Sequence, residues 1–181
     1  MDIKTTEIIS SAASEYEAKE IYTEAVKTLT DAHFTVSVAE SCTGGLMGKL
    51  FTDISGASAV FSGGMITYTN HIKINKLGVS ADTVEKYTEV STQCAAEMAM
   101  RAREYFETDI GVSATGYAGP TGGTEKDPVG TVYLGIAAPD LVEVKKLSFG
   151  AIDREKIRYG TAKIAAESLI CAIKTTKNPK F

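Results

Sequence analysis

The chain has 181 residues, of which 44% are hydrophobic and 23% charged, and its formal net charge is −4. These values are typical of a globular protein, and the length suits one domain with a substantial core. No apolar run approaches the roughly 18 residues that a membrane-spanning helix needs. No strongly basic stretch favours nucleic-acid binding.

The cysteines and histidines argue against a metal centre. Cys42, Cys94 and Cys171 are widely spaced and odd in number, which fits neither a disulfide framework nor a zinc motif. His33 and His71 are the only histidines. We therefore expect no metal and no cofactor. Because the first residues do not form a signal peptide, a reducing cytoplasm is the expected location.

The first third of the chain predicts an extension, a helix and a strand. Residues 1–14 are expected to be a polar extension, frayed or helical, ahead of a domain over residues 15–177 and a tail over 178–181. Apolar residues then recur at helical spacing: Ala18, Ile21, Tyr22, Ala25, Val26 and Leu29. Alternating Phe34, Val36 and Val38 predict the first strand of the domain.

The stretch over residues 37–45, SVAESCTGG, is the most informative part of the chain. An alternating strand ends abruptly in hydroxyls and paired glycines, and an amphipathic segment over residues 46–51 follows. The expected geometry is strand, tight turn and helix, which presents nucleophilic side chains beside the N–H groups of a helix N-terminus. Such groups attract a phosphate or a developing oxyanion. A sharp strand–helix connection with glycine for packing is the simpler alternative.

The middle of the chain predicts another strand and two helices. The strand spans residues 60–68, and Asn70 is expected to cap a short helix that carries Lys73 in its first turn. Ser91 is expected to cap a longer helix with an alanine-rich apolar face. That face allows packing within the chain or between subunits, so a homodimer is one of two alternatives.

The last part of the chain predicts a strand, a hairpin and a helix. Ile110, Val112 and Ala114 alternate into a second hydroxyl–glycine turn, residues 115–119, and the glycine-rich loop over 121–128 is long enough to be functional. An antiparallel hairpin turns near Pro139. Asp153 is expected to cap the last helix.

These elements predict an α/β fold. Helices that alternate with strands indicate a three-layer α/β/α single domain, and the hairpin makes its sheet mixed, partly parallel. Ligands of open α/β sheets bind outside the carboxyl ends of strands. If the two strands that end at residues 41 and 115 are neighbours, their turns face one cleft.

Around Ser41 the sequence lacks the Walker, Rossmann and G-x-S-x-G signatures. Lys73 is a candidate base, but an ordinary lysine is only about one part in a thousand neutral at pH 7. Burial would have to lower its pKa. Tyr68 could shield the amine and orient the hydroxyl. The simpler alternative has Lys73 exposed and Tyr68 in the core.

Other side chains offer further chemistry. Cys42 could be a nucleophile with His71 if the helix N-terminus acidifies its thiol, although buried cysteines are usually structural. Asp127 and Asp153 could ligate a metal, but a loop acid and a helix cap are the simpler roles. Arg154 in the first turn of a helix suggests an anionic partner.

Together, these segments resemble the carboxy-terminal domain of the CinA family of competence/damage-inducible proteins. The resemblance covers about residues 17–175. It rests on AESCTGG (39–45), ISGAS (54–58), FSGGMITYTNHIK (61–73), GVS (78–80), TGYAGPTGG (115–123), PVGTVYLG (128–135) and the DR pair at 153–154. Thr69 stands where serine is frequent. Many relatives carry an additional molybdopterin-binding-like domain at the N-terminus, for which this chain has no room, so it resembles the stand-alone form.

The resemblance implies an activity and a set of site residues. Members of the family are nicotinamide-nucleotide amidases, which convert nicotinamide mononucleotide to nicotinic acid mononucleotide and ammonia for NAD recycling. The implied catalytic residues are Ser41 as nucleophile, Lys73 as base and Tyr68 as an assisting group. The residues expected to bind the substrate, its phosphate or the oxyanion are Thr43, Gly44, Gly45, Thr115, Gly116 and Arg154. A catalytically silent nucleotide-binding or regulatory module is the alternative function.

Overall fold

The computed structural model describes residues 3–176 and contains one six-stranded mixed sheet in the order β1-β6-β5-β4-β2-β3. The strands are β1 (Lys4–Ile9), β2 (Val36–Glu40), β3 (Phe61–Ile66), β4 (Ile110–Gly116), β5 (Thr131–Ala138) and β6 (Leu141–Ser148). β2 is parallel to β3 and β4, whereas β5 is antiparallel to β4 and β6. The predicted mixed sheet is confirmed.

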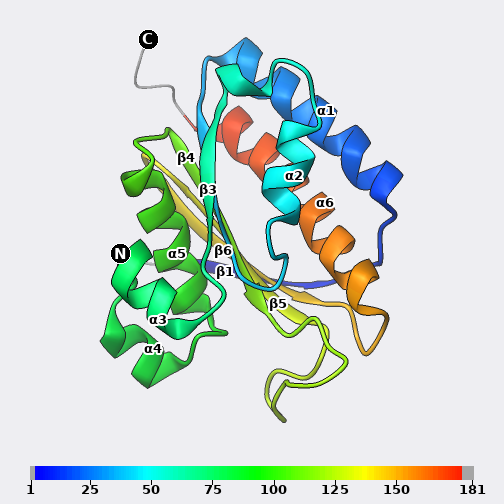
Figure 1. The fold of residues 1–181 in the computed structure, drawn as a ribbon, viewed down its shortest axis with the longest axis vertical. Coiled ribbons are helices and arrows are strands. Elements are labelled where there is room, and N and C mark those ends of the chain that lie inside the picture. Colours follow the sequence, from blue (N-terminus) through cyan, green and yellow to red (C-terminus); the bar gives the residue numbers. More distant parts are fainter. Residues whose placement is uncertain (1–2, 177–181) are drawn as a thin grey trace.

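Helices cover both faces of this sheet (Figure 1). One face carries α1 (Glu15–Ala32), α2 (Leu46–Thr52) and α6 (Arg154–Thr175), and the other carries α3 (Asn70–Ile72), α4 (Ala81–Tyr87) and α5 (Thr92–Tyr105). A π-helical segment, Lys73–Leu77, continues α3. The predicted three-layer α/β/α fold is therefore confirmed.

The alternation of β2 divides its side chains between two cores. Val36 and Val38 belong to the large cluster beneath α1, α2 and α6, whereas Ala39 belongs to a smaller one with Cys94 and Met98 of α5. Successive strand residues point to opposite faces. Glu40 therefore follows Val38 toward α2, and Ser41 follows Ala39 toward α3.

Most predicted helix boundaries agree with the structure, and two details differ. Ser91 and Asp153 accept hydrogen bonds from the first N–H groups of α5 and α6, as expected. Thr69, not Asn70, caps α3, because its hydroxyl accepts from the Ile72 N–H. The helix α4 was not predicted.

The prediction of a frayed or helical start is wrong for residues 4–9. They form β1, an edge strand parallel to β6, with Lys4 opposite Glu143 and Ile9 opposite Ser148. Most of its side chains are exposed, so the strand is held by backbone pairing rather than by an apolar pattern. The predicted tail over 178–181 lies outside the described residues.

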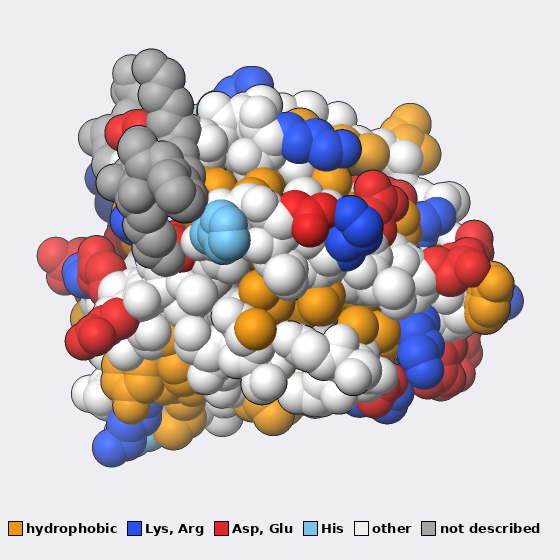
Figure 2. Space-filling model, turned by 90° about the horizontal axis from the view of Figure 1, so that it is seen from above, with side chains coloured by type: hydrophobic (Ala, Val, Ile, Leu, Met, Phe, Trp, Pro, Cys, Tyr) orange, Lys and Arg blue, Asp and Glu red, His pale blue; other side chains and the backbone are white. Residues whose placement is uncertain are grey.

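Figure 2 shows the end of the molecule opposite the carboxyl ends of β2 and β4, with acidic and basic side chains interleaved around uncharged surface. Such mixing gives no extended field of one sign. Among residues 3–176, the helices are too short or too polar to span a membrane.

Candidate active site

The two hydroxyl–glycine turns meet at one cavity. β2 and β4 are adjacent and parallel, with Glu40 opposite Ala114, so Ser41, which follows β2, lies beside Thr115 near the end of β4. A cavity of about 440 Å³ opens there, lined from the first turn by Ser41 and Cys42, and from the second by residues 115–119. The other lining residues are 68–70, Lys73, 89–90, Thr121 and Arg154 of α6.

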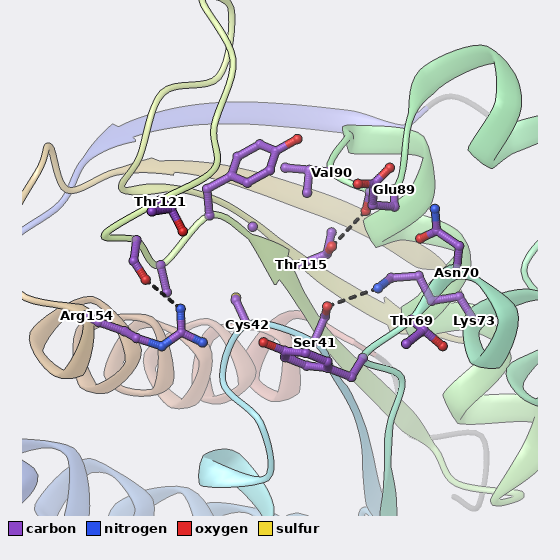
Figure 3. A pocket seen from close by; sticks show the side chains of 15 residues that line it. Ser41, Cys42, Thr69, Asn70, Lys73, Glu89, Val90, Thr115, Thr121 and Arg154 are labelled. Atoms are coloured by element: carbon purple, nitrogen blue, oxygen red, sulfur yellow. Dashed lines mark hydrogen bonds between the residues drawn. The ribbon is translucent and has the colours of Figure 1, made fainter.

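Ser41 and Lys73 touch each other inside this cavity (Figure 3). The Lys73 Nζ lies 3.0 Å from the Ser41 Oγ and 2.8 Å from the carbonyl oxygen of Thr67, to which it donates. Lys73 is only 1% exposed, and Ser41 is 8% exposed. The alternative of an exposed helix lysine is therefore wrong.

Burial also changes the acidity of this lysine. Desolvation lowers the pKa of Lys73 from its ordinary value, because the charged ammonium loses water, while Cys94, Cys42 and Glu89 partly oppose the shift. The expected cause of a usable base, burial, is present. The helix contributes by position: Thr69 caps α3, and the Lys73 N–H donates to the Thr69 carbonyl.

The first turn differs from the expected open anion cradle. The carboxylate of Glu40, 2% exposed, accepts hydrogen bonds from the N–H groups of Gly45, Met47 and Gly48 at 2.9, 3.1 and 2.8 Å. The Gly44 N–H donates to the Ser41 carbonyl. Thr43, Gly44 and Gly45 do not line the cavity. The prediction that the N–H groups of Gly44 and Gly45 are open to an anion is therefore wrong, because the chain supplies its own.

Arg158 is a contributor to this turn that the sequence reading missed. Its guanidinium donates from Nε and Nη2 to the carbonyl oxygen of Thr43, at 3.1 and 2.6 Å. Arg158 lies one helical turn after Arg154, so the i, i+4 spacing of two arginines on α6 was the available signal.

The second turn is held by different contacts. The Thr115 hydroxyl donates to the Glu89 carbonyl at 2.7 Å, and Nη1 of Arg154 donates to the Gly119 carbonyl at 2.7 Å. A side chain at Gly116 would meet the Thr131 carbonyl at 2.5 Å, so only glycine fits between β4 and β5. Figure 3 shows Arg154 on the opposite side of Ser41 from Lys73.

Tyr68 lines the cavity but is 62% exposed, so it is not a core residue. Within residues 3–176 its hydroxyl has no hydrogen bond to Ser41 or Lys73. The expected orienting contact of Tyr68 is therefore not present in this structure. Its position at the cavity wall leaves its ring accessible to a ligand.

The cysteine and metal alternatives are contradicted. Burial raises the pKa of the Cys42 thiol to about 12, the opposite of the expected acidification, and His71 is hydrogen-bonded to Asn75 away from the cavity. Asp127 accepts from Tyr133 and pairs with Lys146, and Asp153 caps α6. Among the described residues, His, Cys, Asp and Glu form no cluster able to hold a metal ion.

Comparisons with known proteins agree with this fold. The family model of the CinA C-terminal domain matches residues 18–173. A relative from Halothermothrix orenii named as a competence-damage inducible protein is 51% identical over 140 residues, which are 77% of this chain and 34% of the relative. A CinA-like protein from Fervidobacterium nodosum is 42% identical over 83% of this chain and 37% of its own length. The chain thus spans about a third of these relatives.

Solved structures give the same result. The competence/damage inducible protein CihA from Agrobacterium tumefaciens is 38% identical, with a TM-score of 0.84 over 88% of this chain and 96% of that one. A CinA superfamily protein from Klebsiella pneumoniae is 27% identical, with a TM-score of 0.84 over 88% and 99%. The chain belongs to the CinA family, through its C-terminal domain.

Proposed function

We propose that the protein is an amidohydrolase that deamidates nicotinamide mononucleotide, with Ser41 as nucleophile and Lys73 as base. The observation that carries this proposal is the 3.0 Å contact between the Ser41 Oγ and the buried Lys73 Nζ. Amide hydrolysis needs a nucleophile, a proton shuttle and donors for the oxyanion. The substrate is the one that the family resemblance implies.

The surroundings of Lys73 suit a base. A neutral amine has two N–H donors and one lone pair. One donor is held by the Thr67 carbonyl, which leaves the lone pair free to accept the Ser41 proton. Because desolvation lowers the pKa of Lys73, a larger fraction of the amine is neutral near pH 7 than in water.

The reaction then follows in two balanced halves. The Ser41 Oγ bonds to the carboxamide carbon as its proton passes to Lys73. The carbon–nitrogen bond breaks, and Lys73 returns the proton to the departing ammonia, which leaves an acyl ester on Ser41. Water attacks this ester as Lys73 takes its proton. The Ser41 oxygen leaves with that proton, which releases nicotinic acid mononucleotide.

Backbone N–H groups near Ser41 would stabilise the oxyanion. The N–H groups of Gly44 and Gly45 are already engaged. The N–H group of Cys42, which lines the cavity, donates to no other residue within the described range 3–176. Cys42 immediately follows the nucleophile, which is where an oxyanion donor commonly lies.

The other end of the cavity suits an anion. Arg154 lines it with one guanidinium nitrogen tied to the Gly119 carbonyl, so donors remain for a phosphate. A lysine at the amide end and an arginine at the far end match a substrate with a carboxamide and a phosphate on either side of a ribose.

The test is ammonia release from nicotinamide mononucleotide by the purified protein. We expect turnover in the wild type and a fall of at least about 1,000-fold in Ser41→Ala, as for other serine nucleophiles. Unchanged turnover in Ser41→Ala would eliminate this mechanism. Mononucleotide binding by calorimetry with no hydrolysis would favour the silent binding module instead.

A further inference from the structure

Two charged side chains outside the cavity hold the turn that carries the nucleophile. Because β2 alternates, Ser41 points toward α3 and Lys73, while its neighbour Glu40 points to the opposite face and reaches α2. Two adjacent residues at the end of β2 thus contact opposite faces of the sheet. Neither Glu40 nor Arg158 lines the cavity.

Glu40 takes the place that an external anion would otherwise occupy. Its carboxylate accepts from three N–H groups of the first turn of α2, all within 3.1 Å, and it is almost fully buried. An anion at a helix N-terminus is stabilised by the helix dipole as well as by these hydrogen bonds. The contact ties the position of β2 to that of α2 across the intervening turn.

Arg158 holds the same turn from its carbonyl side. Two of its nitrogens donate to the single carbonyl oxygen of Thr43, two residues after Ser41. Gly44 and Gly45 adopt φ values of 58° and 94°, which let the chain turn sharply between these two anchors. The Ser41 N–H, in addition, donates to the Ala114 carbonyl of the neighbouring strand.

We propose that Glu40 and Arg158 are positioning residues for the nucleophile, fixing the turn so that the Ser41 Oγ stays within hydrogen-bond distance of the Lys73 Nζ. This inference rests on the proposed function only in taking Ser41 as the nucleophile. It also assigns the N-terminus of α2 an internal ligand, so the substrate phosphate binds elsewhere.

The experiment removes the Glu40 carboxylate by mutation and supplies a free carboxylate, formate, in solution. In Glu40→Ala the three N–H donors face a space of carboxylate size, which formate fits. We expect kcat to fall about 100-fold, the cost of a small misplacement of reacting groups, while KM stays within about twofold. Added formate is expected to restore kcat at a concentration that leaves the wild type unchanged.

A second readout follows the serine itself. Phenylmethylsulfonyl fluoride, a small uncharged reagent, modifies an activated serine, and the labelled peptide is identified by mass spectrometry. The labelling rate of Ser41 is expected to fall with kcat in Glu40→Ala and to recover with formate. A protein that labels and turns over normally without Glu40 overturns the proposal, as does a loss that formate leaves uncorrected.

Two further variants keep the test decisive. Arg158→Lys retains the charge but loses the two-pronged contact, and we expect kcat to fall about tenfold with no effect of formate. If Glu40→Ala does not fold, Arg158→Lys alone tests the proposal. A wild-type kcat in Arg158→Lys then overturns it. Glu17→Gln is the matched control, because it removes a carboxylate that caps α1 without touching the Ser41 turn. It should keep its kcat.

Failure of the two proposals can be told apart. If the wild type labels at Ser41 but does not hydrolyse nicotinamide mononucleotide, the proposed function fails. The labelling rates of Glu40→Ala and Arg158→Lys then still test the positioning role. A wild-type Ser41 that does not label and a protein that does not turn over would overturn both.

Discussion

The hydroxyl–glycine segments at the carboxyl ends of β2 and β4 have nearly the same sequence pattern but different environments. Each ends a buried parallel strand with a hydroxyl residue followed closely by glycine, and they lie side by side. The Ser41 hydroxyl meets the amine of Lys73, whereas the Thr115 hydroxyl donates to the carbonyl of Glu89. The first contact can transfer a proton. The second can only hold the backbone in place.

What distinguishes the two turns is therefore the group across from each hydroxyl. Thr115 is 1% exposed and its proton is committed to a carbonyl, so it positions residues 89–90 on the cavity wall. The first turn is held instead by Glu40 and Arg158, which leaves the Ser41 hydroxyl free for Lys73. Five expected outcomes test this contrast.

Replacing Lys73 should have the largest effect, because it removes the base that we propose for Ser41. We expect Lys73→Met to lower kcat by about 10²–10⁴-fold, the usual contribution of a general base. In the wild type, kcat/KM should rise with pH up to the lowered pKa of Lys73 and then level off. A pH–rate profile measures both, and an unchanged acid limb in the variant would contradict this role.

The same lysine makes stability depend on pH. Its folded-state pKa lies below the ordinary value of 10.5, so between the two values the unfolded state holds a proton that the folded state lacks. Stability should therefore rise with pH across this window, by up to about 1.4 kcal/mol per pH unit. Urea unfolding of wild type and Lys73→Met should show this slope only in the wild type.

A substitution of Arg154 tests whether this side chain binds the substrate phosphate. Arg154→Gln keeps a donor for the Gly119 carbonyl but removes the charge. We expect KM for nicotinamide mononucleotide to rise about 10- to 100-fold, the value of a charged hydrogen bond, with a smaller change in kcat. The matched substrate without phosphate, nicotinamide riboside, should show no such increase. An equal increase for both substrates would mean that Arg154 does not bind phosphate.

Thr115→Val removes the hydroxyl of the second turn while keeping its shape. The loss of its hydrogen bond to Glu89 should cost about 1 kcal/mol of stability. Activity should fall less than about tenfold, because no proton passes through this group. A loss as large as that of Ser41→Ala would show that the two turns share the chemistry.

The smallest effect is expected at Cys42, beside the nucleophile. Its pKa of about 12 keeps the thiol neutral, so Cys42→Ala should retain kcat within about twofold. Iodoacetamide should also fail to modify this thiol at neutral pH. Rapid modification accompanied by inactivation would restore the cysteine alternative.

The sequence predicts the fold because its local signals and its packing agree. The alternation of Val36 and Val38, the caps Ser91 and Asp153, and the turn near Pro139 all specify elements that the structure contains. β1 escaped prediction because its side chains are mostly exposed. Its pairing partner lies about 140 residues away, beyond any local pattern.

The site is only partly readable from the sequence. Ser41 stands out because it directly follows a buried strand, but the approach of Lys73 depends on where the sheet places α3. Glu40 looks like one more residue of the motif until its carboxylate is seen on α2, and Arg158 is distant by 115 positions from the carbonyl that it holds. Contacts of this range follow from tertiary structure, not from spacing.

The parallel pairing of β1 with β6 has a consequence for folding during synthesis. Residues 4–9 are synthesised before residues 141–148, and their β6 partner is absent until then. α1 must likewise wait for α6, against which it packs. Such late closure between distant segments slows folding. Nascent chains arrested before residue 141 should therefore leave the first strand open to proteases.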